Sequence, residues 1–136
     1  MKQLLLILVM ITGLYSCKTN EKKVDDQKYD EQKMDLLTKE KESPNHFLVL
    51  TGDDHRNFFG KTVFNGTIKN NATVCAYKGV RVKLLYFKNG IQVANHEEVF
   101  DKIIEPNDDF SFKAKYKTPK GTDSVAAYIM TAKPVK

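Results

Sequence analysis

The chain has 136 residues, of which 41% are hydrophobic and 29% charged, and its formal net charge is +5 at pH 7. Because domains typically run to ~100–150 residues, this length allows one domain. The modest positive charge is not the signature of a nucleic-acid-binding protein, so we expect no nucleic-acid partner, although a weak preference for anionic surfaces is compatible with it.

The N-terminus has the pattern of a bacterial export signal. A short positive start, residues 1–3, precedes an uncharged and mostly apolar run from Leu4 to Tyr15. A membrane-spanning helix needs ~20 apolar residues, so this run is too short to span a bilayer and fits the apolar region of a signal peptide. We therefore expect residues 1–16 to be a signal peptide.

The apolar run ends in Leu14, Tyr15, Ser16 and Cys17, which resemble the lipobox of bacterial lipoproteins. In that family the cysteine thiol receives a diacylglyceryl group and the signal is cut before the cysteine. The resemblance implies a palmitate-type lipid anchor on Cys17, and two or more acyl chains hold a protein stably to a membrane. An ordinary cleaved signal with a chance cysteine is the alternative.

The residue after Cys17 bears on location. Lipoproteins retained in the inner membrane tend to carry Asp there, whereas this chain carries Lys18. The Ser-Cys-Lys ending also resembles the lipoprotein signals of the phylum Bacteroidota. The resemblance implies a lipid-anchored protein of the cell envelope, in the outer membrane.

The next segment is highly polar. Residues 18–45 hold 15 charged side chains and few apolar ones. Such a composition buries too little apolar area to offset the entropy of ordering the backbone. We expect residues 17–45 to form the lipidated cysteine and a soluble, charged tether. A short helix over residues 29–42, transient or packed on the domain, is the alternative.

From His46 onward, apolar and polar residues alternate with a period of two. In residues 110–117, every second residue is aromatic or alanine, and serine and lysine lie between them. This pattern predicts antiparallel strands with one solvated face, and Asn89-Gly90 predicts a hairpin turn. The predicted strands are 46–51, 61–70, 76–88, 91–100, 110–117 and 123–132. Their spacing predicts an all-β domain over residues 46–136, an immunoglobulin-like β-sandwich of six or seven short antiparallel strands.

Four segments of this domain share a known pattern: Gly66–Asn71, Val80–Leu84, Leu85–Gly90 and Pro106–Phe112. Together they resemble the FxLYD-type domain, an immunoglobulin-like sandwich of exported bacterial proteins. The resemblance covers about residues 60–130. It departs from the family at Phe87, where the family carries Asp, and at Lys83, where it carries an aromatic residue. The resemblance implies an accessory or binding role without established catalytic residues.

The sequence contains no recognisable arrangement of acid, base and nucleophile, so we expect a non-enzymatic protein without a cofactor. His46, His55 and His96 lack the spacing of a metal-ligand pair, and we expect them to be exposed and to bind no metal. A metal ligand at the predicted loop Asp53–Gly60, which contains His55 beside two aspartates, is the alternative. Cys75 is expected to be a small buried residue.

Two groups of residues are candidates for contact with a partner. Lys113, Lys115 and Lys117 share one face of a predicted strand and could meet an anionic partner, or simply form a solvated face that discourages edge pairing. Phe58 and Phe59 would anchor a protein contact if both were exposed. Because so small a core needs large apolar residues, we expect at least one of them to be buried.

The sequence therefore predicts a membrane-anchored lipoprotein whose sandwich is a non-catalytic interaction module for an envelope protein partner. The alternative is a periplasmic inhibitor or ligand-binding protein that uses the basic face or the His55 loop for an anionic or metal ligand.

The lipid anchor can be tested on the native protein. Because the thiol of Cys17 is the predicted site of acylation, mass spectrometry of the mature protein should find an N-terminal peptide that begins with a lipid-modified Cys17. An unmodified thiol at this position would contradict the lipoprotein assignment.

Overall fold

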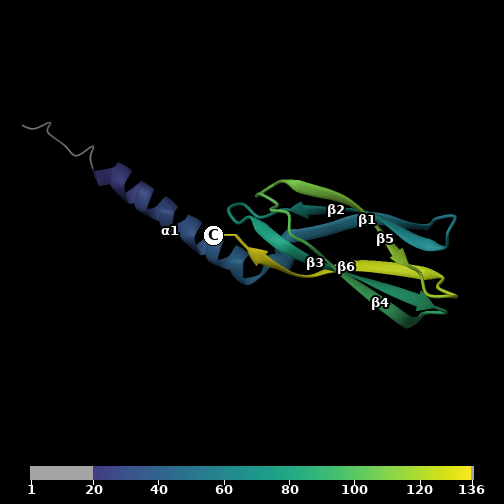
Figure 1. Ribbon diagram of the computed structural model, residues 1–136. Coiled ribbons are helices and arrows are strands. Elements are labelled where there is room, and N and C mark those ends of the chain that lie inside the picture. The colour runs from purple at the N-terminus through teal and green to yellow at the C-terminus, as the bar shows by residue number, and fades with distance from the viewer. Residues whose placement is uncertain (1–19, 136) are drawn as a thin grey trace, which may run out of the picture. The chain divides into compact units, whose positions relative to one another are not determined.

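The computed structural model describes residues 20–135, with side chains from Asp26 onward (Figure 1). The expected signal peptide, its lipobox and Cys17 lie outside these residues, so they stay predictions. The elements are α1 (Asn20–Glu42), α2 (Pro44–Phe47), β1 (Leu48–Arg56), β2 (Lys61–Asn70), β3 (Tyr77–Lys88), β4 (Ile91–Phe100), β5 (Asp109–Lys117) and β6 (Ser124–Pro134). The described part of the chain divides between Gln32 and Lys33 into two units.

The second unit is built on two antiparallel sheets of three strands. One sheet has the order β1-β2-β5 and the other β4-β3-β6. The β1–β2 and β3–β4 connections are hairpins, whereas the chain passes between the sheets from β2 to β3, from β4 to β5 and from β5 to β6. The predicted all-β sandwich of six antiparallel strands is confirmed. The strands after β1 begin and end within two residues of their predicted bounds.

The first strand is longer than its sequence suggests. β1 stays in register with β2 as far as Arg56, which pairs with Thr62. The expected loop over Asp53–Gly60 is therefore wrong: its first part, including His55, is strand, and only a tight turn remains. Polar residues are tolerated here because β1 is an edge strand whose residues from Thr51 to Arg56 are all exposed to solvent.

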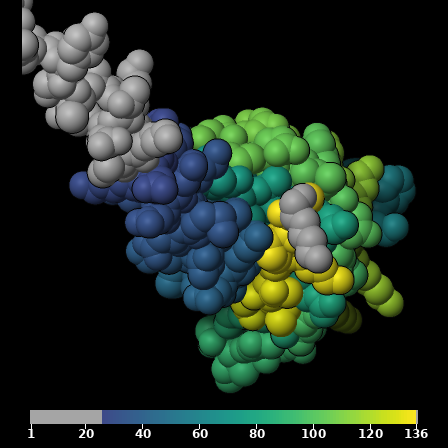
Figure 2. Space-filling model, turned by 90° about the vertical axis from the view of Figure 1, so that its left-hand side faces the viewer, coloured from purple at the N-terminus to yellow at the C-terminus, as the bar shows by residue number. Residues whose placement is uncertain are grey.

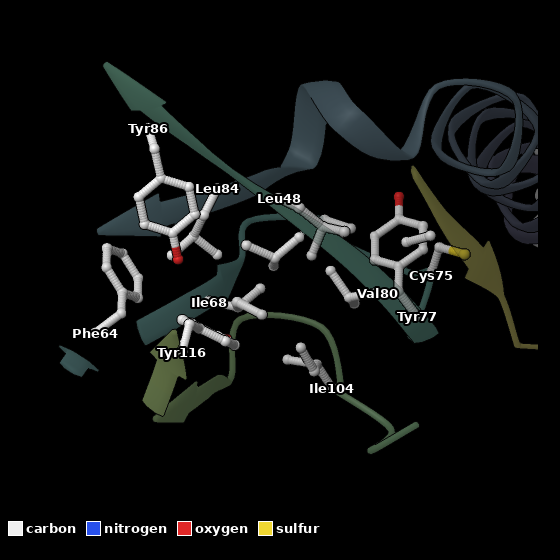
Figure 3. Close-up of a cluster of buried hydrophobic side chains, with 13 residues drawn as sticks. Leu48, Phe64, Ile68, Cys75, Tyr77, Val80, Leu84, Tyr86, Ile104 and Tyr116 are labelled. Carbon is white, nitrogen blue, oxygen red and sulfur yellow. The ribbon is translucent and has the colours of Figure 1, made fainter. Parts of the chain in front are cut away.

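The core lies between the two sheets (Figure 3). Every second side chain of the central strand β3 points inward, and Val80, Val82, Leu84 and Tyr86 are almost fully buried. β2 contributes Phe64 and Ile68 from the facing sheet, as its own period-two alternation requires.

The end of α1 packs in the same unit as the sandwich. Glu40 is only 1% exposed, although it belongs to a highly charged segment. Its carboxylate accepts hydrogen bonds from the backbone N–H groups of Thr73, Val74 and Cys75, at 2.6, 2.9 and 2.7 Å. The Tyr77 hydroxyl donates to the Glu40 carbonyl oxygen at 2.8 Å. Three N–H groups that no strand satisfies thus find a charged acceptor, which is a strong form of hydrogen bond.

This docking differs from the tether expected over residues 17–45. The segment is helical from Asn20 to Glu42, and the compact unit begins at Lys33 rather than at His46. Asn45 also donates its side-chain N–H to the carbonyl oxygen of Met130 in β6, at 2.8 Å. Figure 2 shows this end of the sandwich, where α2 and the C-terminal strand lie side by side.

A buried amide closes the same end. Asn70 is fully buried, and its side-chain nitrogen lies 2.9 to 3.1 Å from the carbonyl oxygens of Cys75, Ile104 and Glu105. Its side-chain oxygen accepts the N–H of Ala72. The backbone groups of the loop after β2 have no partner in a strand ladder, so they need other hydrogen-bond partners. Asn70 and Glu40 provide them from the two sides of the loop.

The Glu40 contact predicts a large loss of stability on a small chemical change. Glu40→Gln should lower the free energy of unfolding by about 3 kcal/mol, because a buried amide nitrogen replaces one of the acceptor oxygens and faces backbone donors. Denaturant unfolding measures this change. Glu42→Gln, an exposed site one half-turn later, is the matched control and should stay within about 0.5 kcal/mol of the wild type. Equal effects of the two variants would contradict the assigned role of Glu40.

Candidate functional site

The β1–β2 turn lies far from the end at which Glu40 docks (Figure 1). β1 begins at Leu48, directly after α2, and runs to Arg56. Because a strand rises ~3.3 Å per residue, Asn57 lies ~30 Å from Leu48. The turn residues Asn57–Gly60, which we call the aromatic tip, therefore project from the opposite end of the sandwich.

Both phenylalanines of the aromatic tip face solvent. Phe58 is 100% exposed and Phe59 84%, and their rings meet edge to face with centroids 6.1 Å apart. The expectation that at least one of them joins the core is wrong. The tip extends beyond the paired ends of β1 and β2, so neither ring can reach the space between the sheets.

The aromatic tip is held by hydrogen bonds. The Asn57 side-chain oxygen accepts the backbone N–H groups of Phe59 and Lys61, each at 3.0 Å. The Asn57 N–H donates to the Lys61 carbonyl at 2.9 Å, and Gly60, with φ of +69°, completes the turn. An asparagine that bonds its own following backbone is a recognised way to fix a turn. The rings are thus presented on an ordered support.

The predicted lysine stripe lies beside this tip. Lys113, Lys115 and Lys117 are exposed on the outer face of β5, as the alternation predicts. The β2–β5 register places Lys117 directly opposite Lys61, which follows the tip in sequence. These four lysines form the basic face, and none of them makes an ion pair with a described residue. Because like charges on opposite strands repel, this arrangement favours an anionic neighbour.

A groove lies along the other side of β5. It has a volume of about 710 Å³ and runs between β5, an edge strand of one sheet, and β4, an edge strand of the other. Its walls include Ala94, Phe100 and Ala114, with lysines of the basic face at its rim. We call it the seam groove. β1 and β6 lie against each other on the opposite side of the sandwich, so the two sides differ.

Polar side chains bridge the seam groove. The Tyr116 hydroxyl on β5 donates a hydrogen bond to the Glu98 carboxylate on β4, and the His96 ring packs on Tyr116 with centroids 4.3 Å apart. Burial raises the pKa of Tyr116, and the bond to Glu98 raises it further. Tyr86 also lines the groove; burial raises its pKa, and its hydroxyl has no hydrogen-bond partner among the described residues. Buried hydroxyls without a partner are uncommon in folded proteins.

The sequence pattern of β4 contained an indication of the seam groove. His96 and Glu98 have the same parity as Ala94 and Phe100, so polar and apolar residues share the inner face of that strand. Such a mixture is typical of an edge strand whose inner face is not fully covered. The period-two alternation predicted the strand but not the groove.

The three histidines lie on separate elements. His46 is in α2, His55 is on β1 opposite Val63, and His96 is in the seam groove. Within residues 20–135, no group of three or more His, Cys, Asp and Glu side chains is placed to hold a metal ion. Nor does this part of the chain contain a helix long and apolar enough to cross a membrane.

Cys75 is 1% exposed, as expected for a small buried residue. Burial raises the pKa of its thiol, and the nearby Glu40 carboxylate raises it further. A protonated buried thiol is a poor nucleophile, so Cys75 belongs to the packing around Glu40 and Tyr77 and not to a reactive site.

Comparison with known proteins adds no relative: no protein-family model, curated protein or solved structure matches the chain. The aromatic tip, the basic face and the seam groove are the features of this chain from which a function can be proposed.

The raised pKa values predict a loss of stability in alkali. Above about pH 10 the unfolded chain ionises its tyrosines, whereas the folded state keeps the Tyr116 and Tyr86 hydroxyls protonated. Their contribution to the free energy of unfolding is therefore complete below about pH 10 and falls as the pH rises further. Denaturant unfolding between about pH 8 and about pH 11 measures the slope. Tyr116→Phe should make this slope shallower, and an unchanged slope would contradict the assigned environment of Tyr116.

Proposed function

We propose that this chain is a lipid-anchored lipoprotein of the cell envelope whose sandwich is a non-catalytic module that binds a protein partner through the aromatic tip. The observation that carries the proposal is the exposure of Phe58 and Phe59. The chain has eight phenylalanines, and the other six are buried or half-buried. The two exposed rings sit together on one ordered turn.

The energetics support a contact at this tip. Burying a phenylalanine side chain gains about 1.5–3 kcal/mol, so a partner pocket that covers both rings would gain several kcal/mol. Aromatic residues are enriched among the few that dominate binding energy. Because hydrogen bonds of Asn57 already fix the turn, binding costs little further ordering.

The basic face supports an acidic partner surface. Lys61 directly follows the aromatic tip, and Lys115 and Lys117 lie on the neighbouring strand. Positive charge around an apolar anchor speeds association with an acidic surface and disfavours basic partners. The proposed partner therefore has an apolar pocket with acidic residues at its rim.

The anchoring part of the proposal rests on the lipobox resemblance at Cys17, and the location in the outer membrane rests on Lys18. The FxLYD-type resemblance adds support for a binding role. The sandwich complements this assignment, since the aromatic tip lies ~30 Å from the point where the chain enters β1. A tethered domain with its contact residues at the far end can reach a partner beyond its own anchor.

The proposal can be tested in cells of the native species. A photo-reactive phenylalanine analogue at position 58 of the full-length protein should form an adduct with one protein on illumination. The same analogue at Ile91 is the matched control, because Ile91 is also an exposed apolar residue, beside the other hairpin turn. Adducts of equal yield at both positions, or adducts with lipid alone, would contradict the proposal.

A second measurement separates binding from folding. Phe58→Ser with Phe59→Ser should abolish co-purification of the crosslinked partner, because it removes both anchors. The free energy of unfolding should stay within about 0.5 kcal/mol of the wild type, since both rings are exposed. Undiminished co-purification would contradict the role of the aromatic tip.

A further inference from the structure

We infer that the seam groove accepts an extended segment of a partner protein, which pairs with β5 as an added strand and alternates acidic with apolar side chains. This site shares lysines of the basic face with the proposed contact at the aromatic tip but does not include Phe58 or Phe59, so the inference does not depend on their binding a partner.

The first observation is that the sandwich is incomplete on the β4–β5 side. The inward residues of the central strands, such as Leu84 and Ile68, are fully buried. Three inward residues of the two edge strands, Phe100, Phe112 and Ala114, are only half-buried although they pack against the same core, whereas Tyr116 of β5 is buried. β5 pairs only with β2, and β4 only with β3, among the described strands. Both edges thus retain backbone groups without a ladder partner.

The second observation is the length of the seam groove. Its lining runs from Ala94 to Phe100 along β4 and from Lys113 to Lys117 along β5, with Pro119 just beyond the end of β5. At ~3.3 Å per residue, the β4 wall is ~20 Å long and the β5 wall is ~13 Å long before the chain continues to Pro119. A long groove bordered by an unpaired strand edge matches about six or seven residues of extended peptide, and addition of a strand to a sheet edge is a common mode of peptide recognition.

The alternation of β5 determines which peptide fits. Successive side chains of an added strand would point to opposite faces of the sheet, in step with those of β5. Those on the outer face would lie beside Lys113, Lys115 and Lys117, where carboxylates form favourable cross-strand pairs. Those on the inner face would enter the groove against Ala94 and Ala114, beside the Tyr116–Glu98 hydrogen bond that bridges it, so only small or medium apolar side chains fit.

The same lysines disfavour a second copy of this chain. Antiparallel pairing of β5 with β5 of another copy would set lysine against lysine across the new ladder, which is destabilising. The exposed face of β4 offers Glu97, but this carboxylate already pairs with Arg81 and Lys83. The site therefore selects an acidic strand from a different protein.

Binding can be measured on the purified full-length chain with a labelled synthetic peptide of about eight residues that alternates Glu and Val. Two control peptides test the inference: one with the same composition but with the Glu and Val residues in separate blocks, and one that alternates Lys and Val. Both should bind about tenfold more weakly or worse. Two further peptides carry N-methyl groups on every Glu or on every Val; because only one of these sets of N–H groups faces β5, one of the two peptides should lose binding.

Charge reversal in the protein provides the matched test. Lys115→Glu should weaken binding of the Glu-Val peptide about tenfold and strengthen binding of the Lys-Val peptide. Lys69→Glu, an exposed lysine on β2 outside the groove, should change neither. Because both lysines are exposed, neither change should unfold the domain.

Nuclear magnetic resonance locates the peptide. Amide shift changes should centre on Ala94–Phe100 and Lys113–Lys117 and should spare Phe58 and Phe59. The inference is overturned by equal binding of the block peptide or of both N-methylated peptides, by shift changes confined to the aromatic tip, or by vesicles of anionic phospholipid that displace the peptide from the groove.

Discussion

A single buried carboxylate joins the helical and the β parts of the sandwich unit. The last turn of α1 contributes Glu40, which accepts three consecutive backbone N–H groups from the loop between β2 and β3. That loop carries the chain from one sheet to the other, and Asn70 holds it from the opposite side. Without these acceptors, the crossover would bury backbone groups that no ladder satisfies. The stacking of the two sheets, and so the seam between them, depends on this loop.

The register of β2 determines the rest of the functional surface. Pairing with β1 ends in the turn that presents Phe58 and Phe59, and pairing with β5 sets Lys61 opposite Lys117. Residues far apart in the sequence thus meet at one end of one sheet. The aromatic tip and the seam groove flank the same lysines, so one strand, β5, provides charge to both proposed contacts.

The sequence predicted the strands well because antiparallel strands with one solvated face require a period of two, and this chain follows it closely. It did not predict the role of Glu40, since one buried glutamate among fifteen charged residues in residues 18–45 has no local signature. The exposure of Phe58 could not be derived from hydrophobicity alone, because it depends on where β1 and β2 stop pairing. Asn57, which bonds the backbone two and four residues later, was the available signal.

The docked end of α1 also changes how the domain responds to mechanical load. β1 is an edge strand, and tension on its first residue would peel it from β2 one hydrogen bond at a time, which needs little force. Tension that arrives through α1 meets the Glu40 cluster and the Tyr77 hydroxyl before it reaches Leu48. Those bonds are loaded together and lead into β3, the central strand of its sheet. The docked end of α1 therefore bears the load first. It protects the β1 edge of the sandwich when the chain is pulled from its N-terminal side.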